Sequence, residues 1–324
     1  MAEGLVSIIG GSGFLGRHIV RALARTGARI RIAVRHPEKA RVLQPMGDVG
    51  QIMLVQTNIR NEDSVRSALR GADVVINLVG VLYNGGPQSF DAVHVEGAAR
   101  VARLSATMGV KTLVHVSAIG ADVESRSRYA RTKGEGEAAV RAAFPGAVIL
   151  RPSVVFGPDD SFFNRFGAMA RMSPVLPVFG NSLAEAGSTR VQPVYVGDVA
   201  AAVAAIVAKP ETVRGQTFEL AGPQAYSWRQ IMELVCDMTG RRRLILPVPY
   251  AIAGIGAALA QQLPSPPLTR DQLILLQIDN VADPAKPGLA ALGVTPTAVE
   301  GVVPAYMQRY RRMGLAPKKA ERVG

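Results

Sequence analysis

Tyr129 and Lys133 stand four residues apart, and their types and spacing suit proton transfer. Residues at positions i and i+4 share one helix face, so the phenol and the ammonium would lie close together. Lys133 would lower the pKa of Tyr129 and bind a ribose, and Tyr129 would then exchange a proton during hydride transfer. Ser117, which precedes the pair, would orient a substrate oxygen. A surface tyrosine and lysine on a helix is the alternative interpretation of this spacing.

A glycine-rich turn follows the apolar run Leu5–Ile9 and has the spacing of a phosphate cradle. Gly10 allows a tight turn, Gly13 lets a pyrophosphate approach the backbone, and Gly16 lets the next helix pack on the strand. The helix N-terminus would point its amides at the phosphates. The residues expected to bind a dinucleotide here are Gly10, Ser12, Gly13, Phe14, Leu15 and Gly16. An ordinary Gly-rich turn is the alternative, but helical apolar spacing after the turn favours the cradle.

Strand-like and helical segments alternate through the first half of the chain. The strand-like runs are Val6–Ile9, Ile30–Val34, Ile52–Gln56, Val74–Leu78, Thr112–Val116 and Val148–Leu150. Helical patterns lie between them at Leu15–Arg25, Pro37–Val42, Asp63–Leu69, His94–Met108 and Arg131–Ala143. The alternation predicts an α/β fold with a doubly wound parallel sheet, the Rossmann fold. Ligands bind such sheets beyond the carboxyl ends of the strands, so the motif residues should converge there.

Arg35 follows the second predicted strand, where folds that prefer NAD usually place an acid. An arginine there favours the 2′-phosphate of NADP and can stack on adenine. We therefore predict NADPH as the cofactor, although a surface arginine at a strand end is the alternative. Asn58 and Ile59 after the third strand and Gly80 after the fourth are further candidates for cofactor binding. Asn58 could equally be a turn residue.

The composition of the chain changes after Pro152, where proline and glycine become frequent. We expect residues 1–155 to form the dinucleotide-binding domain, with residues 189–221 returning to it. The returning elements would be a strand at Val191–Val196, a helix at Val199–Val207 and a strand at Thr217–Leu220. Residues 156–188 and 222–312 would form a small C-terminal lobe, and residues 313–324 a basic tail.

The 324 residues carry a formal net charge of +12. A solvated basic surface is one interpretation, and an acidic protein partner or anionic lipid headgroups are another. Nucleic acid is disfavoured because no binding motif for it accompanies the charge. The single cysteine, Cys236, excludes an internal disulfide, and no His/Cys cluster has the spacing of metal ligands.

The sequence predicts neither a signal peptide nor a transmembrane helix. The first strand begins at Leu5, which leaves no room for a signal peptide before it. The most apolar stretch, Leu244–Leu263, is interrupted by Pro247 and Pro249, and its uninterrupted part, Tyr250–Ala260, falls short of the ~20 residues that a span requires. We expect a buried or interfacial helix there.

These motifs together resemble the extended and atypical short-chain dehydrogenase/reductase (SDR) superfamily, over most of the chain. The segments that carry the resemblance are Gly10–Gly16, Asn77–Gly80, Val116–Ala118, Tyr129–Lys133 and Arg151–Pro158. The resemblance implies that Ser117, Tyr129 and Lys133 correspond to catalytic residues. It also implies that Pro152 and Val154 lie in a segment that contacts the nicotinamide.

A narrower resemblance links the chain to the SDR-like accessory subunit of respiratory complex I (NADH:ubiquinone oxidoreductase) and its bacterial relatives. It rests on Phe162–Phe166, Gln192–Val199 and the region Leu244–Pro267. That family is understood to hold NADPH as a structural element without known turnover. The resemblance implies complex I subunits as partners and a peripheral position. This would be the cytoplasmic side of a bacterial inner membrane, or the matrix side in mitochondria.

Two positions depart from the pattern of active extended SDR enzymes. His94 stands where these enzymes usually carry asparagine, and Ala118 replaces the second residue of the usual Ser-Ser pair. These changes leave cofactor binding intact and make Ser117, Tyr129 and Lys133 candidates for a vestigial site. An active NADP-dependent reductase or sugar-nucleotide epimerase is the first alternative. An NADPH-sensing regulatory protein is the second.

Overall fold

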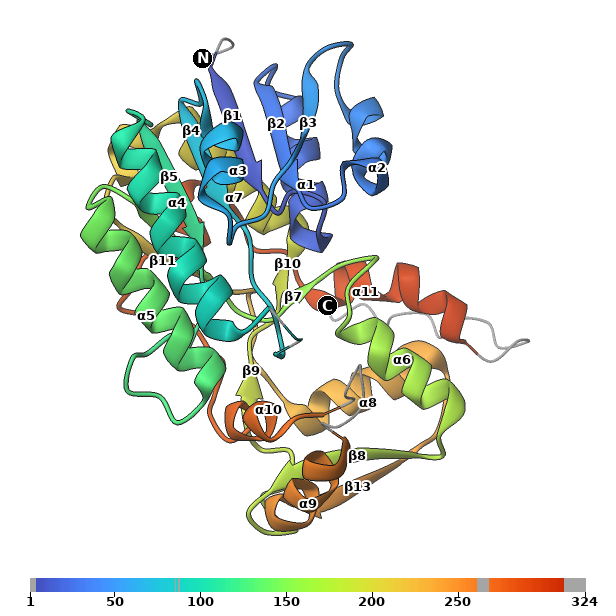
Figure 1. The fold of residues 1–324 in the computed structure, drawn as a ribbon. Helices are drawn as coiled ribbons and strands as arrows, with labels where there is room; N and C mark the ends of the chain where they lie inside the picture. Colours follow the sequence, from blue (N-terminus) through green and yellow to red (C-terminus); the bar gives the residue numbers. More distant parts are fainter. Residues whose placement is uncertain (1–3, 85, 87, 261–267, 312–324) are drawn as a thin grey trace.

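The computed structural model describes residues 4–84, 86, 88–260 and 268–311, and a seven-stranded parallel sheet lies at its centre (Figure 1). The strand order is β11-β6-β5-β4-β1-β2-β3. The strands are β1 (Leu5–Ile9), β2 (Arg29–Val34), β3 (Ile52–Gln56), β4 (Val74–Asn77), β5 (Thr112–Val116), β6 (Val148–Pro152) and β11 (Thr217–Leu220). The order reverses between β1 and β4, the point where ligands bind in sheets of this kind. The predicted doubly wound α/β fold is confirmed.

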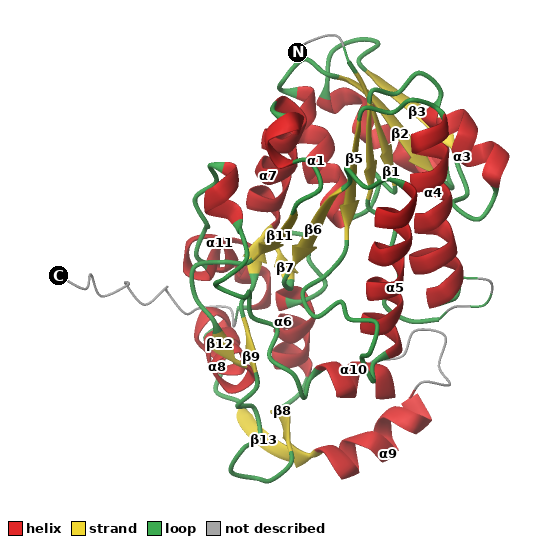
Figure 2. Cartoon of the chain, turned by 90° about the vertical axis from the view of Figure 1, so that its left-hand side faces the viewer, coloured by secondary structure: helices red, strands yellow, loops and turns green. Residues whose placement is uncertain are grey.

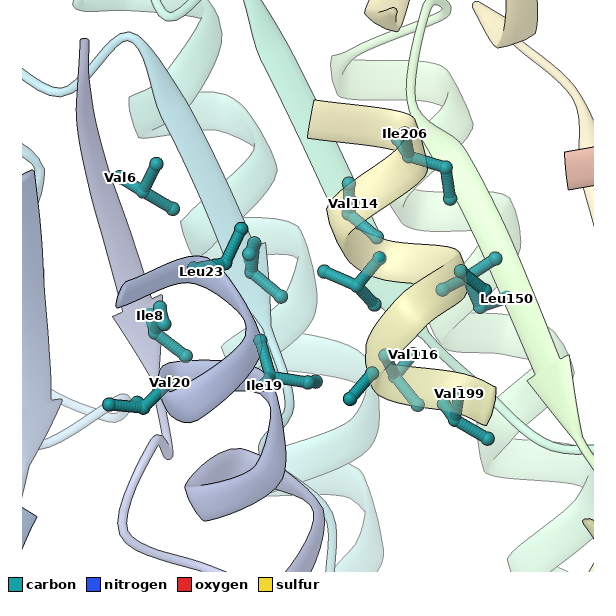
Figure 3. Packing of buried hydrophobic residues seen from close by; sticks show 14 of the residues in the cluster. Val6, Ile8, Ile19, Val20, Leu23, Val114, Val116, Leu150, Val199 and Ile206 are labelled. Atoms are coloured by element: carbon teal, nitrogen blue, oxygen red, sulfur yellow. The ribbon is translucent and has the colours of Figure 1, made fainter. Parts of the chain in front are cut away.

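Helices cover both faces of the sheet, as Figure 2 shows. One face carries α1 (Phe14–Ala24) and α7 (Val196–Ala208), and the other carries α3 (Glu62–Leu69), α4 (Glu96–Thr107) and α5 (Arg128–Ala143). The short α2 (Pro37–Ala40) follows β2. Ile19, Val20 and Leu23 of α1 are fully buried, and they share one hydrophobic cluster with Val199 and Ile206 of α7 (Figure 3). Because the central strands are buried on both faces, they appear in the sequence as continuous apolar runs.

A second group of elements lies beyond the carboxyl edge of the sheet, in the lower part of Figure 1. It comprises α6 (Phe163–Met172), β8 (Val175–Gly180), α8 (Trp228–Thr239), β13 (Leu244–Pro249), α9 (Tyr250–Ala260), α10 (Arg270–Leu275) and α11 (Val299–Met307). Most of these elements share a core that includes Phe163, Leu176, Ile231 and Val303, whereas α9 and α10 pack in a separate small cluster. Cys236 of α8 packs half-buried against this core. The predicted division into two lobes stays a prediction.

The prediction of one strand at Val191–Val196 is wrong. The segment instead forms two short strands, β9 (Arg190–Val191) and β10 (Val194–Tyr195), which pair with β12 (Tyr226–Ser227) and β7 (Val155–Phe156). Pro193 separates them, and a proline has no amide to donate to a ladder. Of the returning elements, α7 packs on α1 and β11 extends the main sheet beside β6.

Two predictions fall partly or wholly on residues outside the described ranges. The basic tail at 313–324 lies outside them, as do residues 261–263 of the apolar stretch. Within the part that is described, no helix combines the length and apolarity that crossing a membrane requires.

Candidate functional site

The glycine-rich turn lies at the carboxyl end of β1. Gly10 has a φ of +85°, a left-handed conformation that other residues rarely adopt. The Gly10 amide donates to the Ala33 carbonyl of β2 at 2.9 Å, which fixes the turn against the neighbouring strand. A Cβ on Gly16 would lie 2.5 Å from the carbonyl oxygen of Gly11, so only glycine allows α1 to pack this closely on the turn.

The start of α1 leaves donors free to bind an anion. The first hydrogen bond of the helix runs from the Arg17 amide to the Gly13 carbonyl at 3.0 Å. The amides of residues 14–16 precede this bond and point out of the helix end, where the positive end of the helix dipole lies. A Cβ on Gly13 would meet only the Gly10 carbonyl oxygen, at 3.5 Å, so Gly13 presents an open surface beside these amides.

Arg35 follows the last residue of β2 and is exposed. In the described part of the chain its side chain makes no hydrogen bond or ion pair, so the guanidinium is available to a ligand. The nearest acid in sequence, Glu38, faces His36 with 3.3 Å between the carboxylate and Nδ1. Binding of a phosphate by Arg35 stays a prediction.

Asn58 and Ile59 are placed by the turn after β3. The Asn58 Oδ1 accepts from the Arg60 amide at 3.1 Å, and the Asn58 amide donates to the Ser64 hydroxyl at 2.9 Å. The Ile59 side chain is buried in the cluster that includes Val65. The structure therefore shows a turn role for Asn58 and a core role for Ile59, while a contact of either with adenine stays a prediction.

Ser117, Lys133 and Gly80 come together at the carboxyl ends of β4 and β5. The Lys133 Nζ is buried and donates to the Val116 carbonyl at 3.3 Å, directly before Ser117. A Cβ on Gly80 would lie 3.2 Å from the same Nζ, so glycine opens the space above the ammonium. Tyr129 lies one turn before Lys133 on α5.

Ser117 is only 4% exposed, and its hydroxyl has no hydrogen-bond partner among the described residues. A buried hydroxyl without a partner costs about 1–3 kcal/mol, so it calls for an explanation. Together with the open glycines Gly13 and Gly80, which follow the neighbouring strands β1 and β4, this hydroxyl fits a site completed by a polar ligand.

Burial sets the protonation of the Tyr–Lys pair. Burial raises the pKa of Tyr129 to about 12, and the predicted lowering by Lys133 is not seen. Burial also lowers the pKa of Lys133 to about 8, and the Glu137 carboxylate opposes that shift. At neutral pH the phenol therefore keeps its proton and the amine remains mainly an ammonium ion. The pair can donate protons, but it holds no ready base.

His94 is buried and is held by hydrogen bonds on both ring nitrogens. Its Nε2 accepts from the Val81 amide at 3.0 Å, so the ring hydrogen is assigned to Nδ1, which donates to the Thr132 hydroxyl at 3.1 Å. Burial lowers the pKa of His94 to about 3, and the Lys133 charge adds to the shift. A neutral His94 thus ties the loop after β4 to α5. The Tyr129 ring packs edge-on against it, with ring centroids 5.5 Å apart.

The backbone around His94 forms a π-helical turn over Asp91–Val95, ahead of α4. The apolar spacing predicts one continuous helix from His94 to Met108, and this prediction is wrong at its start, where the π-helical turn precedes α4. A Cβ on Gly136 would collide with the His94 carbonyl oxygen, so this glycine lets α5 pack against the wide turn. Turns of this type recur at functional sites.

Asn77 is a site residue whose role the sequence analysis did not identify. Its Oδ1 accepts from the Val79 amide at 3.2 Å, and its Nδ2 lies 3.2 Å from the Nδ1 of the buried His115. These contacts shape the turn that leads to Gly80. The signal in the sequence is a polar residue that ends a fully buried strand.

The segment that follows β6 is held by contacts with the residues after β5, with β10 and with α1. The Pro152 carbonyl accepts from the Ile119 amide at 3.0 Å, and the Val154 carbonyl accepts from the Val194 amide at 2.9 Å. Arg17 of α1 pairs with Asp159 at 3.6 Å, so this segment touches the helix that begins at the glycine turn. Contact of Pro152 and Val154 with a nicotinamide stays a prediction.

A separate hollow of about 280 Å³ lies between the end of β8 and the start of α9. Polar side chains line it, among them Arg190 and Asp279, which pair with each other at 2.9 Å. None of its lining residues belongs to the predicted site. The described residues also contain no group of three or more His, Cys, Asp or Glu side chains arranged for a metal ion.

The model of the NAD dependent epimerase/dehydratase family matches residues 6–221. NADH dehydrogenase (ubiquinone) 1 alpha subcomplex subunit 9 of Rattus norvegicus is 33% identical over 309 residues, which cover 95% of this chain and 80% of the relative. The Arabidopsis thaliana protein of the same name is 32% identical over 96% of this chain and 79% of its own. A ceramide reductase of Caulobacter vibrioides is 33% identical over 76% of this chain and 74% of its own.

Among solved structures, the UDP-glucose 4-epimerase of Thermus thermophilus superimposes with a TM-score of 0.70. It covers 94% of this chain and 98% of its own, at 19% sequence identity. At that identity the likeness shows the fold alone. The predicted resemblance to the extended SDR enzymes is confirmed by the family model.

Proposed function

Because the chain belongs to the NAD dependent epimerase/dehydratase family, and within it to the group of the alpha subcomplex subunit 9 proteins, we propose that it is an NADPH-binding accessory subunit of respiratory complex I. Its role in this proposal is structural, without turnover of its own. The observation that carries the proposal is the 33% identity to a named NADH dehydrogenase subunit over 95% of this chain.

The dinucleotide lies along the carboxyl edge of the sheet in this proposal. The amides of residues 14–16, beside Gly13, bind the pyrophosphate, and the free guanidinium of Arg35 binds the 2′-phosphate. Lys133 binds the nicotinamide ribose. The Ser117 hydroxyl, which has no partner among the described residues, forms a hydrogen bond with the nicotinamide end of the dinucleotide. NADPH, when bound, supplies a hydride donor.

The state of the nicotinamide end supports a structural role. His94 uses both ring nitrogens to hold Val81 and Thr132, so it offers no group to a substrate. His94 therefore holds the architecture of the site and takes no part in chemistry there.

The surface of β13 and α9 supports docking on partner subunits. Leu244, Leu246, Ile252 and Ile255 are between 42% and 68% exposed, so this face is apolar. Apolar side chains form the core of stable protein interfaces, and a net charge of +12 steers the chain toward acidic surfaces. In this proposal the chain is peripheral, on the inner side of the bacterial membrane or the matrix side of the mitochondrial one.

Affinity purification of complex I from the source organism tests the proposal. The chain is expected in near-equal amount to a core subunit at moderate ionic strength, because an apolar contact resists salt. Ile252→Asp should lower that amount strongly. Val49→Asp, on the exposed loop before β3, is the matched control and should not. A strongly substoichiometric yield of the wild-type chain, with NADPH oxidation by the isolated protein, would overturn the proposal.

An NADP-dependent reductase is the second candidate. The observation that favours it is the 33% identity to a protein named ceramide reductase, together with the presence of Ser117, Tyr129 and Lys133 at one edge of the sheet. Under this candidate the free chain oxidises NADPH in the presence of a carbonyl substrate, lipid carbonyls included. Tyr129→Phe would abolish that activity while leaving NADPH binding in place, because the phenol is needed only for proton transfer.

A further inference from the structure

One carboxylate of the second lobe holds the helix that carries Tyr129. Asp271, the second residue of α10, accepts from the Ser127 hydroxyl at 3.0 Å, the Arg128 amide at 2.6 Å and the Tyr129 amide at 3.1 Å. Ser127 is the N-cap residue of α5, and its hydroxyl accepts in turn from the Ala130 amide at 3.2 Å. The three first-turn amides of α5 are therefore all satisfied, two of them by a residue far along the chain.

A negative charge at this place suits the helix end. The first amides of a helix have no partner within the helix, and the helix dipole places positive charge there. An acidic side chain from α5 itself commonly fills this role, but the first turn of α5 contains no acid. Asp271 supplies the missing charge from a distance of 142 residues to Tyr129.

The opposite side of the same turn is held by the π-helical segment. Arg128 forms an ion pair with Asp91, and the Phe90 ring lies edge-on to the Tyr129 ring with centroids 5.9 Å apart. Asp91 and Phe90 lie directly before α4, which packs on the sheet, whereas Asp271 belongs to α10. The position of Tyr129 is thus fixed jointly by two parts of the molecule.

The rest of α10 is anchored to α9. Leu273 is buried in a small cluster with Ala253 and Ala257 of α9. A capping box between Thr269 and Gln272 fixes the start of α10, so the carboxylate of Asp271 is held rigidly relative to Leu273. One short helix, α10, thus contacts α9 through Leu273 and the first turn of α5 through Asp271.

We propose that Asp271 is a positioning residue of the dinucleotide site, which couples the α9–α10 unit of the lobe to Tyr129 and hence to the nicotinamide. The inference rests on the proposed binding of NADPH. Lys133 lies one turn further along α5 and is anchored by Val116, so the coupling acts on Tyr129 in particular. Tyr129 then responds to whatever moves α9, without any contact between the two.

The test compares Asp271→Ala with the matched control Asp279→Ala in the full-length protein. Asp279 also lies in this part of the chain, but it pairs with Arg190 and does not contact α5. Hydrogen exchange of the Arg128 and Tyr129 amides should accelerate by about tenfold or more in Asp271→Ala alone. NADPH affinity should change little, because Lys133 keeps its contact with the Val116 carbonyl.

The fluorescence of bound NADPH separates positioning from a general loss of structure. Asp271→Ala should shift this emission, and the shift should vanish when Tyr129→Ala is already present, because both changes act through one ring. Leu273→Ala, which loosens α10 from α9 but keeps the carboxylate, should shift it in the same direction. Unchanged amide exchange and emission in Asp271→Ala would overturn the inference. If the wild-type protein binds no NADPH, the proposed function fails, whereas the amide exchange still reports on the contact.

Discussion

The two ends of the proposed dinucleotide site are built in different ways. At the phosphate end, residues 10–17 supply the turn, the close packing and the free amides from one short stretch of chain. At the nicotinamide end, Tyr129 is placed by His94 and by Asp271, 35 residues before it and 142 after it. The phosphate end is thus built from residues that are adjacent in sequence, whereas the nicotinamide end depends on contacts between distant elements. Dinucleotide binding can therefore persist when catalysis at Tyr129 is lost.

Gly16→Ala should have the largest effect of the changes considered, because it disrupts the close packing of α1 on the glycine-rich turn. The new Cβ would meet the Gly11 carbonyl oxygen at 2.5 Å, and a main-chain atom cannot move aside. We expect a loss of about 3 kcal/mol in the free energy of unfolding, measured with urea. Gly13→Ala, which enters open space, should cost less than about 1 kcal/mol. Equal losses would contradict the packing argument.

Arg35→Ala should weaken NADPH binding by roughly tenfold to a hundredfold, which corresponds to the loss of a charge-assisted pair at a partly solvated site. NADH binding should change little, because NADH lacks the 2′-phosphate. Arg25→Ala, at the other end of α1, serves as the control with the same loss of charge. Equal affinity of the wild-type protein for NADPH and NADH in a titration would show that Arg35 does not select the cofactor.

His94→Asn should make the nicotinamide end less sensitive to acid. The pKa of His94 in the folded state, about 3, lies below its ordinary value of 6.5, so protonation favours the unfolded chain. The contribution to stability is complete above pH ~6.5 and is lost as the pH falls toward 3; at pH ~5 the loss is about 2 kcal/mol. Unfolding measured from neutral to acid pH should show a shallower decline for His94→Asn, with His115 still titrating. Identical declines for both proteins would argue against a neutral, buried His94.

Lys133 should give NADPH affinity a modest dependence on pH. Its pKa is lowered to about 8, so the ammonium is present below that pH and is lost above it. Affinity of the wild-type protein should therefore fall about three- to tenfold between pH ~7 and pH ~9, the range of one hydrogen bond from a charged group. Lys133→Met should bind more weakly at neutral pH and show no such slope. A slope that survives in Lys133→Met would assign the titration to another group.

The difference between the two ends also explains what the sequence could predict. The glycine turn, Arg35 and the strand ends follow from apolar runs and turn residues that are adjacent in sequence, and the fold follows from their alternation. His94 as an anchor and Asp271 as a remote cap could not be predicted, because their partners are set by packing between distant elements. The π-helical turn at Asp91–Val95 belongs to the same class, since its space is created by Gly136 on another helix.

The strand expected at Val191–Val196 was wrong for a related reason. Its apolar residues satisfy the pattern of a sheet strand, but Pro193 has no amide to donate to a ladder. The residues before and after it instead form β9 and β10, which pair with β12 and β7. The pKa of Tyr129 also could not be predicted from the sequence. Spacing on a helix suggests the influence of Lys133, whereas the degree of burial, which only the fold determines, raises the value instead.

The proposed function requires that this chain holds NADPH and does not consume it. The most direct test is to isolate the chain with complex I, extract and quantify its nucleotide, and follow NADPH absorbance while a panel of carbonyl compounds is added. We expect about one NADPH or NADP⁺ per chain, thermal stabilisation by added NADPH that Gly13→Val removes, and no oxidation above the rate without protein. Rapid oxidation with any carbonyl, lost in Tyr129→Phe, or a chain that carries no nucleotide would contradict it.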